Sequence, residues 1–324
     1  METKSGSAGF LSWKRSWLVR AILHLRLEEL IAYVFFIPCL AITMKVNFYL
    51  WLQGFGLGRK ITGGVSRIIL VTVLLPLIAY LSHQSHKSKG LTMLRNALPF
   101  VVCLAIYTNL HDTIHFVNPH DIQDWLLKAD IAIFGVEPTL WAQQFYRSWL
   151  TDVLSFCYEF YLPMTILLPV VLYAQGKSAE ARTALIGIVI CFYWGYLLYI
   201  AFPAVPPRLA IADQYTRDLQ GWIITAAQRA MVSITETSSR AAFPSLHSAI
   251  TLLSLIYSYQ FARRLFWFLL PVGIGLLTAT IYLRHHWAVD LLAGIPLGLL
   301  AYRYAPSWDR AWESWRTRTL QAMG

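Results

Sequence analysis

Eight long apolar runs dominate this sequence, and each approaches the length that crosses a lipid bilayer. They fall at residues 30–52, 65–82, 97–117, 153–174, 183–203, 244–262, 265–283 and 288–304, and Arg67 and Pro76 interrupt the second. About 20 apolar residues span a bilayer as a helix, and only helices or closed barrels satisfy the backbone in lipid. Because the runs are continuous rather than alternating, the sequence predicts an all-α fold, a polytopic transmembrane helical bundle.

The charged residues indicate how this bundle is oriented. They make up only 14% of the chain, against about 25% in soluble domains, and the net charge is +10. With eight spans and a cytoplasmic N-terminus, sixteen lysines and arginines fall in cytoplasmic segments and ten in outer segments. We therefore expect the N-terminus in the cytoplasm. Because the basic residues are scattered over loops, we expect no nucleic-acid partner, and the sequence identifies no protein partner.

The first chemical pattern is the stretch LRHHWAVD at residues 283–290. His286 and Asp290 are four residues apart at the start of an apolar run, so a helix places them on one face. A carboxylate that accepts the proton of one imidazole nitrogen leaves the other nitrogen as a nucleophile. His285 is expected to point elsewhere. The alternative is a histidine and an aspartate in water at a helix end.

The second pattern is FPSLHSAIT at residues 243–251. Proline and serine favour the first positions of a helix, so Ser245 is expected to cap a helix whose free amides bind an anion. His247 stands beside them, where it would protonate a leaving oxygen. The alternatives are a simple helix cap, or zinc held by His247, His286 and Asp290.

The third pattern is FPAVPPRLA at residues 202–210. Its prolines predict a rigid turn that presents Arg208 on the outer face, where Arg284 and Arg240 also fall. Guanidinium groups match phosphate oxygens, so the three arginines predict a phosphate site. The alternative for each is a charge that reaches from the bilayer to the interface.

Together the three stretches resemble the signature of the type 2 phosphatidic acid phosphatase superfamily, in the branch that includes inositol phosphorylceramide synthase. In that family Lys-x6-Arg-Pro is followed by Pro-Ser-Gly-His and by Ser-Arg-x5-His-x3-Asp. Here the arginine expected six residues before His286 is Thr280, and the lysine expected before Arg208 is Ala201. The resemblance implies a metal-independent enzyme without cofactors, and Arg284 or Arg240 in place of the missing cation.

The resemblance covers about residues 97–304 and suggests the domain organisation. We expect a basic amphipathic segment at 1–29, two accessory transmembrane helices at 30–96, a six-helix catalytic core at 97–304 and an amphipathic tail at 305–324. On the outer face, a head-group pocket is predicted around His111, Asp112, His115 and Glu159. The spacing of His111 and His115 also fits a metal site, although no third ligand is near. Tyr193, Tyr196 and Tyr199 suggest an aromatic belt or a lipid groove.

The sequence therefore predicts a multi-pass membrane enzyme whose active site is on the extracytoplasmic face and whose substrates are membrane lipids. His286 would attack a lipid phosphoester, and the phosphoryl head group would pass to an alcohol. A lipid phosphate phosphatase that uses water is the second reading. A membrane transporter or scaffold is the reading from another class.

Overall fold

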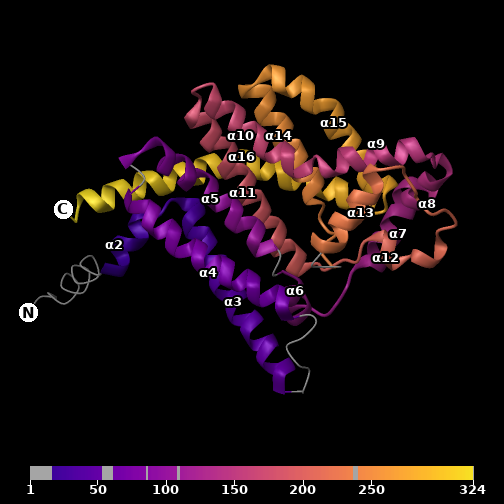
Figure 1. Cartoon of the computed structure of the whole chain (residues 1–324), viewed down its shortest axis with the longest axis horizontal. Coiled ribbons are helices and arrows are strands. Elements are labelled where there is room, and N and C mark those ends of the chain that lie inside the picture. Colours follow the sequence, from indigo (N-terminus) through magenta and orange to yellow (C-terminus); the bar gives the residue numbers. More distant parts are fainter. Residues whose placement is uncertain (1–16, 53–60, 85–86, 108–109, 236–239, 324) are drawn as a thin grey trace, which may run out of the picture.

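The structure is a computed structural model that describes residues 17–52, 61–84, 87–107, 110–235 and 240–323. Within these ranges every regular element is a helix, and the one extended pairing is an isolated bridge between Ala204 and Ala241. The prediction of an all-α bundle is therefore confirmed (Figure 1).

The helices follow the apolar runs closely. They are α2 (Trp17–His24), α3 (Leu27–Leu52), α4 (Ile61–Gln84), α5 (Lys89–Tyr107), α6 (Leu110–Val117), α7 (Gln123–Phe134), α8 (Pro138–Ala142), η2 (Gln143–Phe145), α9 (Ser148–Glu159), α10 (Tyr161–Ala174), α11 (Ser178–Ala201), α12 (Pro207–Ala210), η3 (Ala212–Gln214), α13 (Ile224–Thr235), α14 (Leu246–Phe261), α15 (Arg263–Tyr282) and α16 (Ala288–Gln321).

Six of the eight predicted runs fall on single helices, whereas 97–117 is divided between α5 and α6 and 153–174 between α9 and α10. Fewer helices qualify as full spans. Among the described residues four are long and apolar enough to cross a membrane, namely α5, α11, α15 and α16. The bent pair of α9 and α10, which meet at 46°, makes a fifth if it counts as one span. Helix α14 has 16 residues, short of the usual length. The tail predicted at 305–324 continues α16, which is unbroken to Gln321.

Helix α14 lies at the centre of the bundle. It packs against α10, α11, α15 and α16. Helix α16 runs along the long axis, from the end where α7, α8 and α12 gather to the C-terminus (Figure 1). The starts of α14 and α16 therefore lie at the same end of the molecule, where the two histidine patterns of the sequence meet.

Two glycines allow α14 and α16 to pack with their backbones close together. A Cβ atom at Gly294 would lie 2.4 Å from the carbonyl oxygen of Ser245, and one at Gly298 would lie 2.7 Å from that of Ala249. The spacing is that of the Gly-x-x-x-Gly pattern, which brings membrane helices into close contact. A hydrogen bond of 2.9 Å from Ser248 Oγ to the Leu291 carbonyl joins the same two helices.

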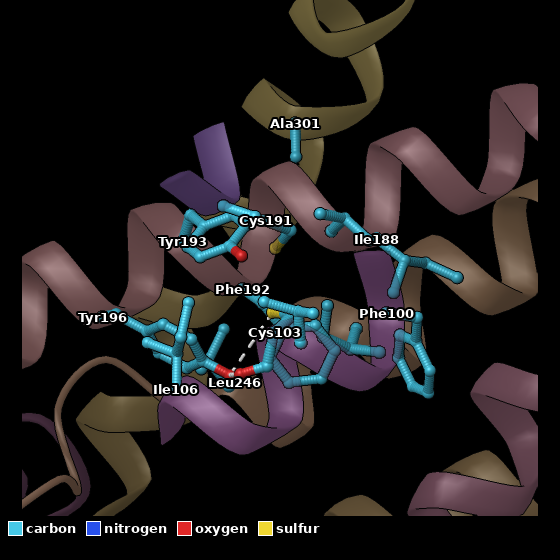
Figure 2. Packing of buried hydrophobic residues seen from close by; sticks show 14 of the residues in the cluster. Phe100, Cys103, Ile106, Ile188, Cys191, Phe192, Tyr193, Tyr196, Leu246 and Ala301 are labelled. Atoms are coloured by element: carbon cyan, nitrogen blue, oxygen red, sulfur yellow. Dashed lines mark hydrogen bonds between the residues drawn. The ribbon is translucent and has the colours of Figure 1, made fainter. Parts of the chain in front are cut away.

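The three tyrosines of α11 lie inside the bundle. Tyr193, Tyr196 and Tyr199 are each no more than 3% exposed, so the predicted aromatic belt or lipid groove is wrong for these side chains. Tyr196 donates from its hydroxyl to the Cys103 carbonyl over 3.1 Å, and Figure 2 shows both residues among buried apolar neighbours. The three-residue spacing places the three rings on one helix face, and in the bundle this face packs inward.

Buried ion pairs join the N-terminal helices to the core at the opposite end. Glu29, on α3, pairs with Arg95 on α5 over 2.6 Å, and Arg182 on α11 bridges Glu28 and Asp309, also over 2.6 Å. Both glutamates are almost fully buried. Loss of one partner would leave a buried charge uncompensated, which is strongly destabilising. These pairs therefore fix α3 against α5, α11 and α16.

We expect Gly294→Ala to separate α14 from α16 and to lower both the melting temperature and any activity. The new methyl group meets backbone atoms, which do not rotate away, and overpacking of this kind costs about 1–3 kcal/mol. Thermal unfolding in detergent measures the effect. Gly90→Ala is the matched control, because its nearest neighbour would be 3.9 Å away. Equal melting temperatures for the two variants would contradict the close contact.

The charge bias of the loops predicts that Asp213→Cys reacts with a membrane-impermeant maleimide from outside the cell. Asp213 is exposed on η3, in the outer segment between α11 and α14. Gln175→Cys, at the exposed turn after α10, should react only after permeabilisation. The cysteines at 103, 157 and 191 are buried, so they give little background. The reverse labelling pattern would invert the orientation.

Candidate active site

The start of α14 forms as the sequence predicts. Ser245 is the N-cap residue, and its Oγ accepts a hydrogen bond of 3.3 Å from the Ser248 amide. The Ser245 amide itself donates to the Asp290 carbonyl over 3.0 Å, so it joins α14 to α16 and is not available to a ligand. The first amides of a helix have no partner within that helix, which leaves those of Leu246 and His247 at the positive end of the helix dipole.

His247, His286 and Asp290 form a continuous chain of polar contacts. His247 Nδ1 lies 3.1 Å from His286 Nε2, and His286 Nδ1 lies 3.3 Å from Asp290 Oδ2. His286 is 4% exposed and Asp290 is fully buried. The two histidine patterns, 39 residues apart in the sequence, thus meet in one site. The Asp290 contact fixes the ring orientation of His286 and assigns the proton to Nδ1, so Nε2 carries the lone pair.

Arg208 brings positive charge to these histidines. It lies on the short helix α12, which begins at Pro207 where the prolines predicted a rigid turn, and its amide donates to the Arg284 carbonyl over 3.0 Å. Electrostatic interaction acts between its guanidinium group and both His285 and His286. Burial, opposed by a hydrogen bond with the Ala242 backbone and supported by the charge of Arg208, lowers the pKa of His286 to about 4. His286 is therefore neutral at neutral pH.

Two tyrosine rings pack against His247 and His285. Tyr158 stacks on His285 with ring centroids 4.3 Å apart and on His247 with centroids 4.9 Å apart, and Tyr161 lies 4.3 Å from His247. His285 thus belongs to the same cluster of rings, while Asp290 contacts His286 and not His285, as expected. Its Nε2 faces the Gln228 amide nitrogen at 3.0 Å, so it accepts a hydrogen bond from α13.

The other two predicted arginines have partners outside this cluster. Arg284 stacks on the Tyr215 ring at 3.8 Å and donates to the Arg217 carbonyl over 2.6 Å. Arg240 pairs with Asp121. Thr280, which stands where the family pattern has an arginine, is buried. Its carbonyl accepts hydrogen bonds from the amides of both His285 and His286 and so holds the turn between α15 and α16.

The predicted head-group pocket is described only in part. Glu159 is half-buried at the end of α9, next to Tyr158. His111, Asp112 and His115 lie on α6, but their side chains lie outside the described part of the structure. Among the side chains that are described, no group of three His, Cys, Asp or Glu is placed to hold a metal ion.

Asp130 is a residue of this region whose role was not apparent from the sequence. It lies on α7 and is fully buried, and its Oδ2 and Oδ1 accept hydrogen bonds of 2.9 and 2.8 Å from the amides of Ala288 and Val289. It therefore caps α16 from 158 residues away. In the sequence it stands as one of five acidic residues in the outer segment 118–152. Its place within the apolar stretch ADIAIF was the one sign of burial.

Comparison with known proteins identifies the family of the chain. The chain matches the PAP2 superfamily over residues 124–304, a range that contains Arg208, His247, His286 and Asp290. A PA-phosphatase related-family protein of Dictyostelium discoideum is 29% identical over 112 residues, which are 34% of this chain and 20% of that protein. The chain thus matches about a fifth of that relative's length, and no solved structure matches. Because the match extends over more than half of its 324 residues, the chain belongs to the PAP2 superfamily.

Proposed function

We propose that the protein is an integral membrane enzyme that cleaves a lipid phosphoester through a phospho-histidine and passes the phosphoryl head group to an alcohol. The observation that carries the proposal is the contact chain from His247 through His286 to Asp290. Membership of the PAP2 superfamily supports a lipid phosphatase-type membrane enzyme. The alcohol acceptor rests on the resemblance of PSLH and RHHWAVD to the inositol phosphorylceramide synthase branch.

In the first step Nε2 of His286 attacks phosphorus in line with the leaving oxygen. The P–O bond breaks as the N–P bond forms, and His247, held as the imidazolium by the charge of the bound phosphate, gives its Nδ1 proton to the departing oxygen and becomes neutral. Asp290 stabilises the positive charge that develops on His286, because its carboxylate faces Nδ1. In the second step His247 removes a proton from the acceptor hydroxyl, which attacks the phospho-histidine and restores Nε2.

The two histidines must separate when the substrate binds. A phosphorus atom needs to lie about 3–3.5 Å from the nucleophile, and a leaving oxygen hydrogen-bonds at about 2.7–3.2 Å. Both do not fit between nitrogens that are 3.1 Å apart. The substrate phosphate therefore takes the place of the direct hydrogen bond between His247 and His286, and binding opens the pair.

The phosphate oxygens are held by Arg208 and by the amides at the start of α14, beside Ser245. The field of Arg208 reaches His286, and a helix N-terminus favours an anion. Arg284 and Arg240 would add charge only by leaving Tyr215 and Asp121. A clamp built mainly on one guanidinium suits a phosphodiester, which carries one negative charge, better than a monoester, which carries nearly two. This favours transfer of a head group over hydrolysis of a phosphomonoester.

The remaining predicted residues complete the site. We place the head group near Glu159, next to Tyr158, and near His111, Asp112 and His115 on α6. The site faces the outer side of the membrane, with the N-terminus in the cytoplasm.

A lipid phosphate phosphatase is the second candidate, because the same residues serve water as acceptor and the family match includes phosphatase-type enzymes.

The function is tested by incubating the purified protein in detergent with a labelled phospholipid, with and without an alcohol acceptor. We expect labelled head group to appear on the alcohol, and His286→Ala to abolish transfer. Release of the head group without acceptor, at the same rate, would favour the phosphatase. No turnover of any lipid, together with uptake in vesicles, would favour a transporter.

The roles of the two histidines predict different responses to the leaving group. A nitrophenyl phosphoester needs little protonation to depart, and general-acid help is worth about 10²–10⁴-fold only where the leaving oxygen is basic. His247→Ala should therefore regain much of its activity on that substrate, whereas His286→Ala should stay inactive, as measured by nitrophenol release.

His285→Ala serves as the matched control for this comparison. Its ring stacks on Tyr158 but makes no contact with Asp290, so we expect a smaller loss that is similar on both substrates. Rescue of His286→Ala and not of His247→Ala would reverse the two roles.

A further inference from the structure

We propose that Asp130 is a positioning residue for the catalytic histidine: its carboxylate holds the first turn of α16 and thereby fixes Asp290 against His286. The inference depends on the proposed function only in taking His286 as the nucleophile. Asp130 binds the amides of Ala288 and Val289 and not the histidines themselves, so it acts through α16.

Two carboxylates bind three consecutive amides at the start of α16. Asp290 Oδ2 accepts from the Trp287 amide over 3.0 Å, and Asp130 accepts from the amides of Ala288 and Val289. These are the amides that lack partners within the helix. Their positions fix the backbone between His286 and Asp290, and therefore the four-residue spacing on which the contact of the two side chains depends.

Helix α7 gives Asp130 a rigid support. Leu126, one turn before Asp130, is buried in a cluster with Trp287, Val289, Ala204 and Ala242. Ile122, next to the helix, donates from its amide to the Pro203 carbonyl over 2.9 Å. The Trp287 ring is fully buried and donates from Nε1 to the Val205 carbonyl over 3.0 Å. Asp130 therefore holds α16 from a fixed position rather than moving with it.

Charge adds to this geometric effect. An electrostatic interaction acts between Asp130 and Asp290, which lie at the same helix terminus. A negative charge on Asp130 raises the electron density that Asp290 offers to the Nδ1 proton of His286, and so makes Nε2 a better nucleophile. Among the described residues, Glu137, before α8, is the other charged group whose field reaches Asp130.

The protonation of Asp130 gives the proposal a measurable signature. Burial raises the pKa of Asp130 to about 6, opposed by the amides of Ala288 and Val289 and supported by the charge of Glu137. Above pH 6 the carboxylate is ionised and holds both amides; below pH 6 it is protonated and the cap weakens. The pKa of His286 is about 4, so His286 itself remains neutral across this interval. Activity should therefore fall as the pH drops through about 6.

The first test is the pH profile of kcat on a nitrophenyl phosphoester for three proteins. Wild type should lose activity below pH about 6. For Asp130→Asn, kcat at pH 7.5 should fall on the order of tenfold, the size of effect seen when a residue that orients a functional side chain is lost. Its KM should change little, and its pH profile should show no step near pH 6.

Glu137→Gln is the matched control for Asp130→Asn. Glu137 is also a buried carboxylate that caps a helix, since it accepts from the Leu140 amide, but α8 carries no site residue. This variant should keep the step near pH 6. Any shift of the step should be to lower pH, because the loss of the Glu137 charge lowers the pKa of Asp130. A step that persists in Asp130→Asn, or that is absent from wild type, overturns the proposal.

The second test does not depend on enzyme activity. Diethylpyrocarbonate acylates neutral imidazole, and mass spectrometry of the peptide gives the rate at His286. The rate should fall below pH about 6 in wild type and be reduced and independent of pH between 5 and 7 in Asp130→Asn. If no phosphoester is turned over but this pattern appears, the proposed function fails and the role of Asp130 stands. Equal rates in the two proteins at pH 7.5 overturn that role.

Discussion

The close contact between the first turns of α14 and α16 is the constraint on which the site depends. Gly294 removes the side chain that would hold the helices apart, and the Ser245 amide then reaches the Asp290 carbonyl. Because of this contact, His247 on α14 meets His286, which immediately precedes α16. The histidines are separated by a whole span in the sequence, so only the packing of the two helices makes them partners.

The two helices use their N-termini in different ways. Both starts lie at the same end of the bundle, so their positive dipole ends are neighbours. At α14 the cap is the neutral hydroxyl of Ser245, which leaves amides for an anion. At α16 the carboxylates of Asp290 and Asp130 occupy the first amides. In the proposed reaction, the phosphate of the substrate would therefore be attracted to α14 and repelled from α16, which would orient it with respect to His286.

Most of the fold could be predicted from the sequence because membrane spans are encoded locally, in length and continuity of apolar residues. The contact of His286 with Asp290 was predictable from their four-residue spacing, but the expectation that one helix carries both was wrong, because His286 lies just before Trp287, the N-cap of α16. What the sequence did not reveal depends on long-range packing. Asp130 caps a helix 158 residues away, His285 stacks on Tyr158, and the tyrosines of α11 face inward. No local pattern distinguishes such residues from interfacial ones.

The distribution of the arginines connects the fold to the proposed reaction. Arg284 supports the segment at Tyr215 and Arg217, and Arg240 is paired with Asp121, so both hold the connecting segments between helices. Arg208 is the guanidinium whose field acts on the histidines. With Thr280 in place of the family arginine, less positive charge faces the phosphate. A substrate of lower charge loses less from that change, and this is the argument behind the proposal of a phosphodiester donor and of head-group transfer.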